Sequence, residues 1–247
     1  MNKISIIIPY FRNFIFFKKT LKSILNQSYQ NYEIIIVYDD PEKKELFVLK
    51  KLIANKKKIK LFINKRNIGA GLSRNKGAKM AKGKYLAFID SDDIWKQNKL
   101  KLQTKFMKKF NLKISHTSYL IINDIGKIIG KRKAKHVQTY SNLINSCDIG
   151  LSTVIVEKKL FLRNKFSSNI TKEDYVSWLK ISKKISIYGL DKYLVLWRKT
   201  QGSLSSNYYQ KIFDAFDIYY KKEKFGFVKS LFYVLVLSTN YFLKKYL

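Results

Sequence analysis

Four polar residues, Asp90-Ser91-Asp92-Asp93, directly follow the apolar run 85–89. Carboxylates crowded at the end of a strand repel one another, and a divalent cation relieves that repulsion. Oxygen ligands of this kind suit Mn²⁺ or Mg²⁺, which keep coordination positions for water and substrate phosphates. The cluster is therefore a candidate cation site. Taken alone, it also fits a solvated turn or a helix cap, with Asp93 capping a helix that begins near Trp95.

A glycine-containing stretch, residues 67–77, lies just upstream of this cluster. Glycines permit a tight loop before a helix, and Arg74 in the first helical turns can hold a diphosphate through two parallel hydrogen bonds. The stretch has neither the Gly-x-Gly-x-x-Gly pattern of dinucleotide-binding folds nor the Gly-Lys-Ser/Thr of a P-loop. The diphosphate contact predicted for Arg74 therefore belongs to neither a dinucleotide-binding fold nor a P-loop.

The first half of the chain alternates short β-branched runs with longer helical patterns. The expected strands cover residues 4–8, 33–37, 59–64 and 85–89, and the expected helices lie near residues 16–25, 43–55 and 71–82. This alternation predicts βαβ units around a mostly parallel sheet. Ligands of such sheets bind beyond the carboxyl ends of the strands. Three expected strands run at that end into polar residues, at 10–13, 39–40 and 90–93.

The second half has a different pattern. A strand at 114–122, a turn at 123–126 and a short strand after it predict a hairpin, and a region of mixed character with a helix at 172–183 follows to residue 193. We expect one domain over residues 1–205. Residues 206–247 are expected to form a helical appendage of two helices broken near Gly226.

Four segments taken together resemble the glycosyltransferase family 2 enzymes, which have the GT-A fold. The segments are Ile4–Phe11, Gln27–Val37, Asn67–Gly77 and Gly83–Asp93, in the expected order and spacing over roughly the first 95 residues. The resemblance implies an α/β fold with a mostly parallel, Rossmann-like sheet flanked by helices. It also implies a nucleotide-diphosphate sugar as donor and transfer with inversion at the anomeric carbon.

The resemblance implies roles for individual residues near the donor. Arg74 would hold the diphosphate, Asp90 would lie near the ribose and the metal, and Asp92 would be the main protein ligand of Mn²⁺ or Mg²⁺. The remaining residues expected to border the nucleotide sugar are Pro9, Tyr10, Gly69 and Ser91.

An acidic residue after the second strand would bind the base. The family usually places two acids directly after this strand, whereas Tyr38 intervenes here, so both Asp39 and Asp40 are candidates. Asp39 is the preferred one.

A further segment, Lys172–Leu179, resembles the family's Glu-Asp motif on a helix. Inverting transfer requires a carboxylate to take the acceptor hydroxyl proton, and Asp174 is the candidate base. Trp178 lies four residues on, on the same helical face, and is expected to stack on the acceptor sugar. The alternative is that Asp174 caps the helix and Trp178 belongs to the core.

The segment Trp197–Ser205 resembles one that closes over the diphosphate in relatives. Many relatives have a histidine where this chain has Thr200, which puts a contact from that position in doubt. Arg198 and Lys199 are expected to compensate electrostatically.

The chain is strongly basic: 50 basic and 17 acidic residues give a formal charge of +33. Only six of the basic residues are arginine, the residue that nucleic-acid readers favour. No nucleic-acid motif accompanies the charge, so a nucleic-acid-binding protein is the weaker alternative, and a compositional bias explains the excess as well. The single cysteine, Cys147, favours a reducing compartment.

The aromatic and lysine-rich helices expected after residue 206 suit an anionic membrane interface, or packing against the catalytic domain or a second subunit. No run is long enough to span a bilayer. We therefore expect a metal-dependent transferase at the cytoplasmic face of the membrane. It would add a single sugar, with UDP as the favoured nucleotide, to a glycan or lipid-linked acceptor of the bacterial envelope. A nucleotidyltransferase is the other alternative.

Overall fold

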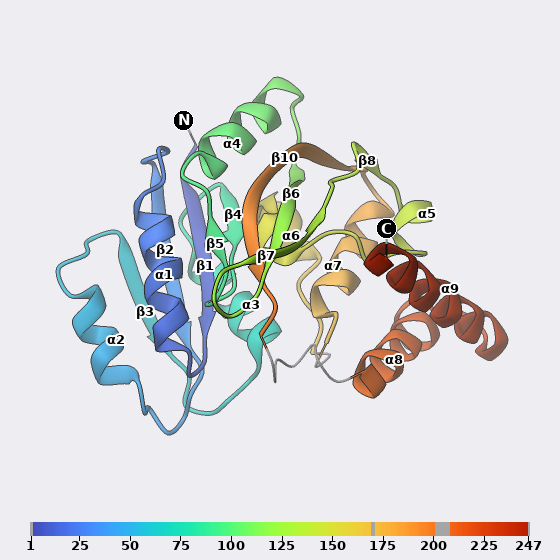
Figure 1. The fold of residues 1–247 in the computed structure, drawn as a ribbon, viewed down its shortest axis with the longest axis horizontal. Helices are drawn as coiled ribbons and strands as arrows, with labels where there is room; N and C mark the ends of the chain where they lie inside the picture. Colours follow the sequence, from blue (N-terminus) through green and yellow to red (C-terminus); the bar gives the residue numbers. More distant parts are fainter. Residues whose placement is uncertain (1, 169–170, 201–207, 247) are drawn as a thin grey trace.

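The computed structural model describes residues 2–168, 171–200 and 208–246 (Figure 1). Its strands are β1 (Ile4–Tyr10), β2 (Tyr32–Tyr38), β3 (Ile59–Ile63), β4 (Tyr85–Phe88), β5 (Ile94–Trp95), β6 (Ile114–Ile122), β7 (Ile128–Arg132), β8 (Val137–Gln138), β9 (Ile155–Glu157) and β10 (Ile187–Arg198). Its α-helices are α1 (Phe14–Leu25), α2 (Leu46–Ile53), α3 (Ala70–Met80), α4 (Lys99–Lys109), α5 (Tyr140–Leu143), α6 (Lys158–Arg163), α7 (Glu173–Ser182), α8 (Tyr208–Asp217) and α9 (Phe227–Tyr246). A 3₁₀ turn, η1 (Leu151–Thr153), and a π-helical turn, η3 (Ile218–Lys222), complete the elements.

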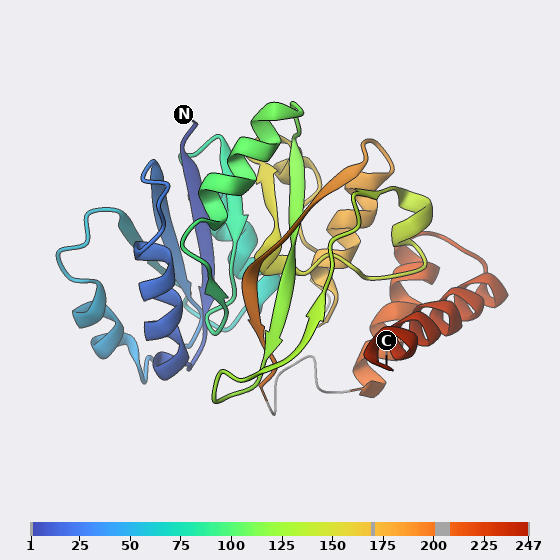
Figure 2. The same cartoon turned by 45° about the horizontal axis from the view of Figure 1, so that its top comes forward.

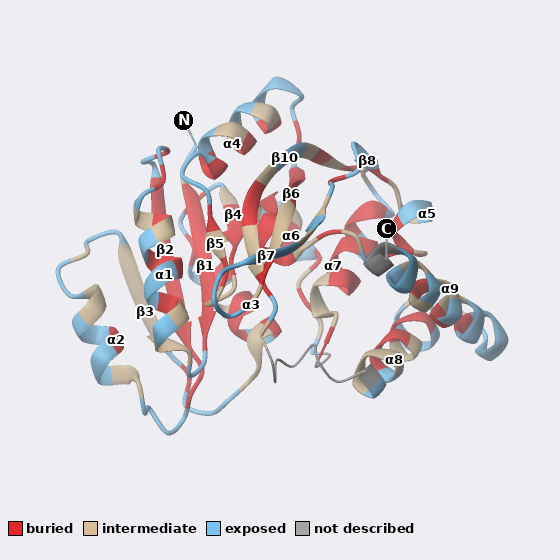
Figure 3. Ribbon diagram, in the orientation of Figure 1, coloured by how far each residue is buried: buried red, intermediate tan, exposed pale blue. Residues whose placement is uncertain are grey.

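Parallel strands in the order β3-β2-β1-β4 form one half of the sheet. Every residue of β1 and β2 is buried, as expected for β-branched runs in a sheet covered on both faces (Figure 3). Successive side chains alternate between two hydrophobic clusters, so that Ile7 and Ile35 enter one and Ile6 and Ile34 the other. The predicted βαβ units are confirmed here.

The other half of the sheet continues as β9-β6-β10-β5 and is mixed in direction. β9 runs antiparallel to β4 and β6, whereas β10 runs parallel to β6. β6 and β7 form the predicted hairpin, with Tyr119 opposite Arg132. The sequence pattern does not predict the twelve-residue strand β10. Gly189 and Asp191 interrupt its apolar residues, and its pairing with β6 shifts register near Leu190 and Tyr193.

The C-terminal helices α8 and α9 pack beside α7 and α5 (Figures 1 and 2). The break predicted near Gly226 is confirmed between η3 and α9. Ile218 and Leu237 belong to the same hydrophobic cluster as Leu179 of α7, and the Lys183 ammonium lies 2.6 Å from the Glu223 carboxylate. One continuous core therefore joins these helices to the domain. The boundary predicted between residues 205 and 206 lies outside the described residues.

None of the helices in the described ranges has the length and apolar character needed to cross a bilayer.

Candidate functional site

A cleft of about 860 Å³ opens at the carboxyl ends of β1, β2 and β4, at the lower edge of the sheet in Figure 1. Most of the predicted site residues line it, namely Pro9, Tyr10, Asp39, Gly69, Arg74, Asp90, Ser91, Asp92 and Asp174. Four other predicted residues, all within the described ranges, lie outside its walls: Asp40, Trp178, Arg198 and Lys199. Parallel strands that end at one edge thus gather donor-side and acceptor-side candidates in one space.

The guanidinium of Arg74, on α3, lies between two carboxylates. It donates from Nη2 to Oδ1 of Asp90 and from Nη1 to Oε1 of Glu173, each at 2.5 Å. Burial is the largest influence on the pKa of Arg74 and lowers it, but Asp90 and Glu173 together raise it above its ordinary value. Arg74 is therefore a permanent buried cation. Within the described part of the chain its Nε has no hydrogen-bond partner.

The loop after β4 crowds three carboxyl groups. The backbone N–H of Asp93 donates to the carbonyl of Asp90 at 3.2 Å, which closes a tight turn. The pKa of Asp92 is raised to about 7, first by burial and second by the negative charge of the nearby Asp90 carboxylate. The crowding that the sequence predicts is therefore present between Asp90 and Asp92.

Asp93 is a structural residue of this loop. Its Oδ1 accepts from the backbone N–H of Arg198 at 2.8 Å, and its Oδ2 accepts from the Ser152 hydroxyl at 2.5 Å. Burial, followed by repulsion from Asp92 and Asp90, raises its pKa well above the ordinary value. The alternative that Asp93 caps a helix is wrong, because β5 follows directly and α4 begins only at Lys99.

Arg198 supports the same loop from behind. Its Nε donates to the Asp92 carbonyl at 3.0 Å and its Nη1 to the Asn123 carbonyl at 2.8 Å, while the guanidinium lies 4.4 Å from the centre of the Phe16 ring. Arg198 is 3% exposed and lies outside the cleft walls. The electrostatic compensation predicted for Arg198 stays a prediction, because a charge acts without direct contact.

Lys199 is exposed and lies outside the cleft walls, and its backbone N–H donates to the carbonyl of Ile122 at 2.8 Å. Its charge acts on Lys211 of the cleft, so the electrostatic compensation predicted for Lys199 stays a prediction. The rest of the predicted closing segment, residues 201–205, lies outside the described residues.

The carboxylates of Asp90 and Asp92, both in the loop after β4, fit a divalent cation whose remaining ligands are water and substrate. No group of three or more His, Cys, Asp or Glu side chains that could hold a metal occurs within the described ranges. Mg²⁺ and Mn²⁺ bind through one or two carboxylates together with water and phosphate oxygens. Burial, and after it the negative charge of Asp90, raises the pKa of Asp92, and such an ion would offset both effects.

Asp39 and Asp40, the two candidates for binding the nucleobase, have different surroundings. Asp39 lines the cleft, where its Oδ1 accepts from the N–H of Ile68 at 3.0 Å and its Oδ2 from the N–H of Gly69 at 2.9 Å. Gly69 has a φ of 83°, a conformation that favours glycine, and it stands at the N-cap of α3. Asp40 instead points to Arg12, whose Nη2 donates to its Oδ1 at 3.0 Å. The geometry thus favours Asp39 over Asp40.

Tyr10 borders the cleft but its ring is fully buried, stacked on Tyr38 with centroids 5.3 Å apart. Its hydroxyl donates to Glu45 at 2.5 Å. The neighbouring Phe11, which the sequence analysis did not select, is 44% exposed and also lines the cleft. Phe11 is therefore the aromatic ring available at this end.

Asp174 lies at the start of α7, facing the cleft beside Glu173. Its Oδ1 accepts from the backbone N–H of Tyr175 at 2.8 Å. Burial raises its pKa to about 7, the Glu173 carboxylate raises it as well, and Arg74 opposes both. A carboxyl group that titrates near neutrality suits proton transfer.

Trp178 belongs to the hydrophobic core. Its side chain is fully buried and packs edge to face against Phe166, with ring centroids 5.7 Å apart. The prediction that Trp178 stacks on the acceptor sugar is therefore wrong. The alternative is correct for Trp178 but not for Asp174, because the N-cap of α7 is Lys172.

The sequence analysis missed several residues of the cleft. Glu173 had a signal, since it directly precedes the predicted base, but its contact with Arg74 depends on the fold. Tyr119, Cys147 and Lys211 also line the cleft and come from segments that share no motif, whereas Trp197 belongs to the segment predicted to close over the diphosphate. Burial and the neighbouring charges of Lys172 and Lys199 lower the pKa of Lys211.

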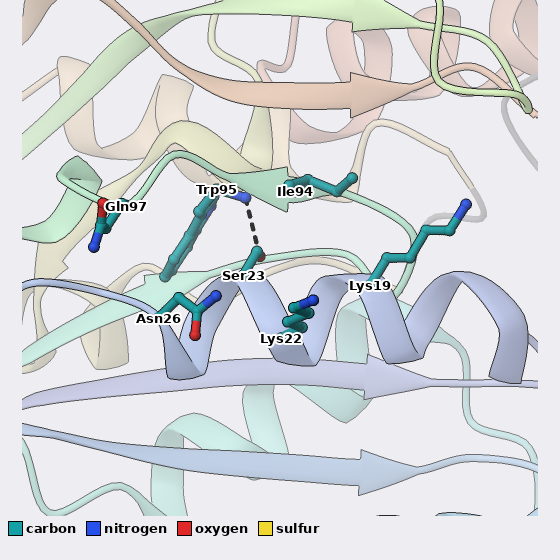
Figure 4. Close-up of a pocket in the computed structure, with 7 residues that line it drawn as sticks. All are labelled: Lys19, Lys22, Ser23, Asn26, Ile94, Trp95 and Gln97. Carbon is teal, nitrogen blue, oxygen red and sulfur yellow. Dashed lines mark hydrogen bonds between the residues drawn. The ribbon is translucent and has the colours of Figure 1, made fainter.

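A second hollow, of about 440 Å³, lies beside α1 and β5 (Figure 4). Its lining residues are Lys19, Lys22, Ser23, Asn26, Ile94, Trp95 and Gln97. The Ser23 hydroxyl accepts from the backbone N–H of Trp95 at 3.1 Å, and no carboxylate lines the hollow. It offers neither a proton acceptor nor a cation site.

Comparison with known proteins agrees with this geometry. The profile of the family described as "Glycosyl transferase family 2" matches residues 5–169. A glycosyltransferase of Haemophilus influenzae is 33% identical over 246 residues, covering 99% of this chain and 98% of its own length. An Escherichia coli enzyme, the UDP-Glc:α-D-GlcNAc-diphosphoundecaprenol β-1,3-glucosyltransferase WfgD, is 35% identical, covering 87% of this chain and 84% of its own.

Among solved structures, S. aureus TarS residues 1–349 in complex with UDP-GlcNAc has a TM-score of 0.69 and 22% sequence identity. The match covers 92% of this chain and 69% of the TarS chain. It confirms the predicted α/β architecture, a central sheet of many strands flanked by helices.

Proposed function

This chain belongs to glycosyl transferase family 2 and is a glycosyltransferase, and from that premise we propose that it performs metal-dependent, inverting transfer of a single sugar. The donor is a UDP-sugar, and the acceptor is a lipid-linked saccharide of a bacterial envelope glycan. One observation carries the proposal: Arg74, Asp90, Asp92 and Asp174 come from three separate segments and line the same cleft.

Asp174 is the proposed acceptor of the proton that leaves the acceptor hydroxyl. The acceptor oxygen forms a bond to the anomeric carbon as the bond from that carbon to the donor diphosphate breaks, and the hydroxyl proton passes to the Asp174 carboxylate. Asp92, with Asp90, would hold Mn²⁺ or Mg²⁺, which when bound stabilises the charge that develops on the departing diphosphate. Arg74 fixes Asp90 relative to Glu173 and adds a buried positive charge beside that leaving group.

The relatives support a substrate class and, through it, a location for the reaction. WfgD is named for a UDP-glucose donor and a diphosphoundecaprenol acceptor, and we extend that substrate class to this chain. A lipid-linked acceptor places the reaction at a membrane surface, and cytosolic nucleotide sugars place it on the cytoplasmic face. The net charge of +33 also favours an anionic membrane surface.

The test is a panel of nucleotide sugars assayed with Mn²⁺ and a synthetic GlcNAc-diphospho-lipid acceptor. We expect release of a nucleoside diphosphate with one donor, abolished by EDTA. Asp174→Asn should lower kcat by about 100-fold or more while UDP binding is kept. Asp191→Asn, which changes an exposed carboxylate outside the cleft, is the matched control.

Either of two results would overturn the proposal. Release of pyrophosphate would identify a nucleotidyltransferase. Folded Asp174→Asn enzyme that turns over donor and acceptor at the parent rate would remove the assigned base.

A further inference from the structure

Helix α9 presents an apolar face to solvent. Val228, Leu231, Phe232 and Leu235, which we call the α9 apolar face, are 79%, 44%, 58% and 67% exposed. Their spacing of three and four residues places them on one side of the helix. Contiguous exposed apolar surface of this kind marks an interaction site, because isolated soluble surfaces rarely keep it.

The opposite side of α9 is firmly packed. Ser230, Val234 and Leu237 are buried there, and Val234 and Leu237 enter the main hydrophobic cluster. Just before α9, Glu223 accepts from the Tyr140 hydroxyl at 2.5 Å and pairs with Lys183. The helix is thus held in place by its inner side, and the α9 apolar face is left outward by the fold itself (Figure 3).

Positive charge borders this face. Lys222, Lys224 and Lys229 are exposed next to it, whereas the acidic side chains of the same segment are largely turned inward. Asp214 is buried and accepts from the Thr171 hydroxyl at 2.6 Å. A cationic rim around apolar side chains complements an anionic lipid surface and repels a second copy of a chain with the same charge.

Helix α8 lies between α9 and the cleft. Lys211 of α8 lines the cleft, and its ammonium lies 5.6 Å from the centre of the Tyr241 ring of α9. The spacing of Tyr241 from Val234 and Leu237 places it on the inner side of α9, so the α9 apolar face points away from this contact.

We propose that the α9 apolar face inserts into the interface of an anionic lipid bilayer and thereby holds the catalytic domain at the membrane surface. Its aromatic and aliphatic side chains enter between headgroups, while the bordering lysines contact lipid phosphates. The benefit for a lipid-linked acceptor rests on the proposed function, but the docking itself does not.

The test is co-sedimentation of the full chain with vesicles of phosphatidylethanolamine and phosphatidylglycerol, compared with phosphatidylcholine vesicles. We expect binding to the anionic vesicles that weakens as salt rises. The triple variant Leu231→Glu/Phe232→Glu/Leu235→Glu should bind at least about tenfold more weakly. The control variant Phe47→Glu/Phe110→Glu/Ile129→Glu changes three scattered exposed residues by the same charge and should lose much less.

A second measurement places the face in the bilayer. Tryptophan fluorescence of Phe232→Trp should be quenched by brominated lipid, and that of Phe47→Trp should not. Equal loss of binding by both triple variants would show that net charge alone drives binding and would overturn the proposal. The proposal would also be overturned if the parent chain did not bind vesicles but formed a dimer, and if the triple α9 variant were monomeric.

Binding of UDP with Mn²⁺, measured in solution, separates this proposal from the proposed function. Vesicle binding without UDP binding would leave the docking intact and refute the assigned activity. UDP binding without vesicle binding would refute the docking and leave the assigned activity intact.

Discussion

Arg74 and Glu173 are 99 residues apart in the chain, yet Nη1 of one donates to Oε1 of the other at 2.5 Å. The pair ties α3 to the first turn of α7, the turn that carries Asp174. Both side chains are largely buried, so removing Arg74 leaves the Glu173 carboxylate without its partner, whereas removing Glu173 leaves Arg74 paired with Asp90 alone. Position and protonation of the proposed base therefore depend on this contact.

Glu173→Gln should shift the pH dependence of activity. In the parent, burial is the largest cause of the raised pKa of Asp174, the Glu173 carboxylate raises that pKa further, and Arg74 lowers it. The amide removes the influence of the Glu173 charge and leaves the positive charge of Arg74 less neutralised, so the pKa of Asp174 falls below about 7. A base works only when ionised, and the acid limb of the kcat/KM profile should therefore move to lower pH. Asp191→Asn should leave the limb in place, and an unmoved limb in Glu173→Gln would contradict the assignment.

Asp92→Asn should remove metal-dependent activity. Without Asp92, Asp90 is the one proposed metal ligand left in the loop after β4, and kcat/KM should fall by about 100-fold or more even at high Mn²⁺. The measurement is the donor turnover rate as a function of Mn²⁺ concentration. An unchanged metal dependence would exclude Asp92 as a ligand.

The same substitution should stabilise the metal-free fold above neutral pH. The folded-state pKa of Asp92, about 7, lies above its ordinary value of 3.8, so the protonated group favours the fold. That contribution is complete below about pH 4 and is lost as the pH rises through about 7. In EDTA at pH 8, Asp92→Asn should therefore melt at a higher temperature than the parent, and the difference should shrink toward pH 4. A lower Tm of the variant at pH 8 would contradict this account.

Arg198→Ala should damage the site indirectly. The guanidinium donates to the part-buried carbonyl of Asp92 and lies over the Phe16 ring, so its loss removes that hydrogen bond and that ring contact. We expect a loss of about 2–4 kcal/mol in the free energy of unfolding and a higher KM for the donor. Lys199→Ala is the matched control, since that neighbouring side chain is exposed, and it should change neither quantity much. Equal effects of the two variants would show that Arg198 has no special supporting role.

The sequence predicts those parts of the site that depend on one segment. The acidic loop after β4 and the glycine loop before α3 are local features, since each follows from residues adjacent in the chain. The strand order and the cleft at the strand ends follow from the βαβ pattern. Arg74 is correctly placed in the cleft for the same reason.

The rest depends on contacts between distant segments. Burial of Arg198 is set by β10, a strand whose interrupted apolar pattern hides it. Trp178 was selected for its spacing from Asp174, but spacing does not tell which side of a helix faces a cavity and which faces the core. The pairing of Arg74 with Glu173 has no local signal.

Trp178 offers a test of that distinction. As a core residue, Trp178→Ala should lose about 3–5 kcal/mol in the free energy of unfolding. Trp178→Phe should lose less and keep the KM for the acceptor, because the ring does not reach the cleft. A raised acceptor KM in a well-folded Trp178→Phe variant would restore the stacking role.

Gly71→Ala tests how closely α3 and α7 must approach. A Cβ at this position would lie 2.8 Å from Cγ of Glu173 and 3.0 Å from the carbonyl oxygen of Ser167. The backbone oxygen cannot easily retreat, so Glu173 must move, and its hydrogen bond to Arg74 should weaken. We expect kcat/KM to fall by about tenfold, with the acid limb of its pH profile shifted in the same direction as in Glu173→Gln. Gly130→Ala is the matched control, because its Cβ would meet nothing nearer than 3.4 Å. If Gly71→Ala kept the parent profile, the approach of the two helices would not govern Asp174.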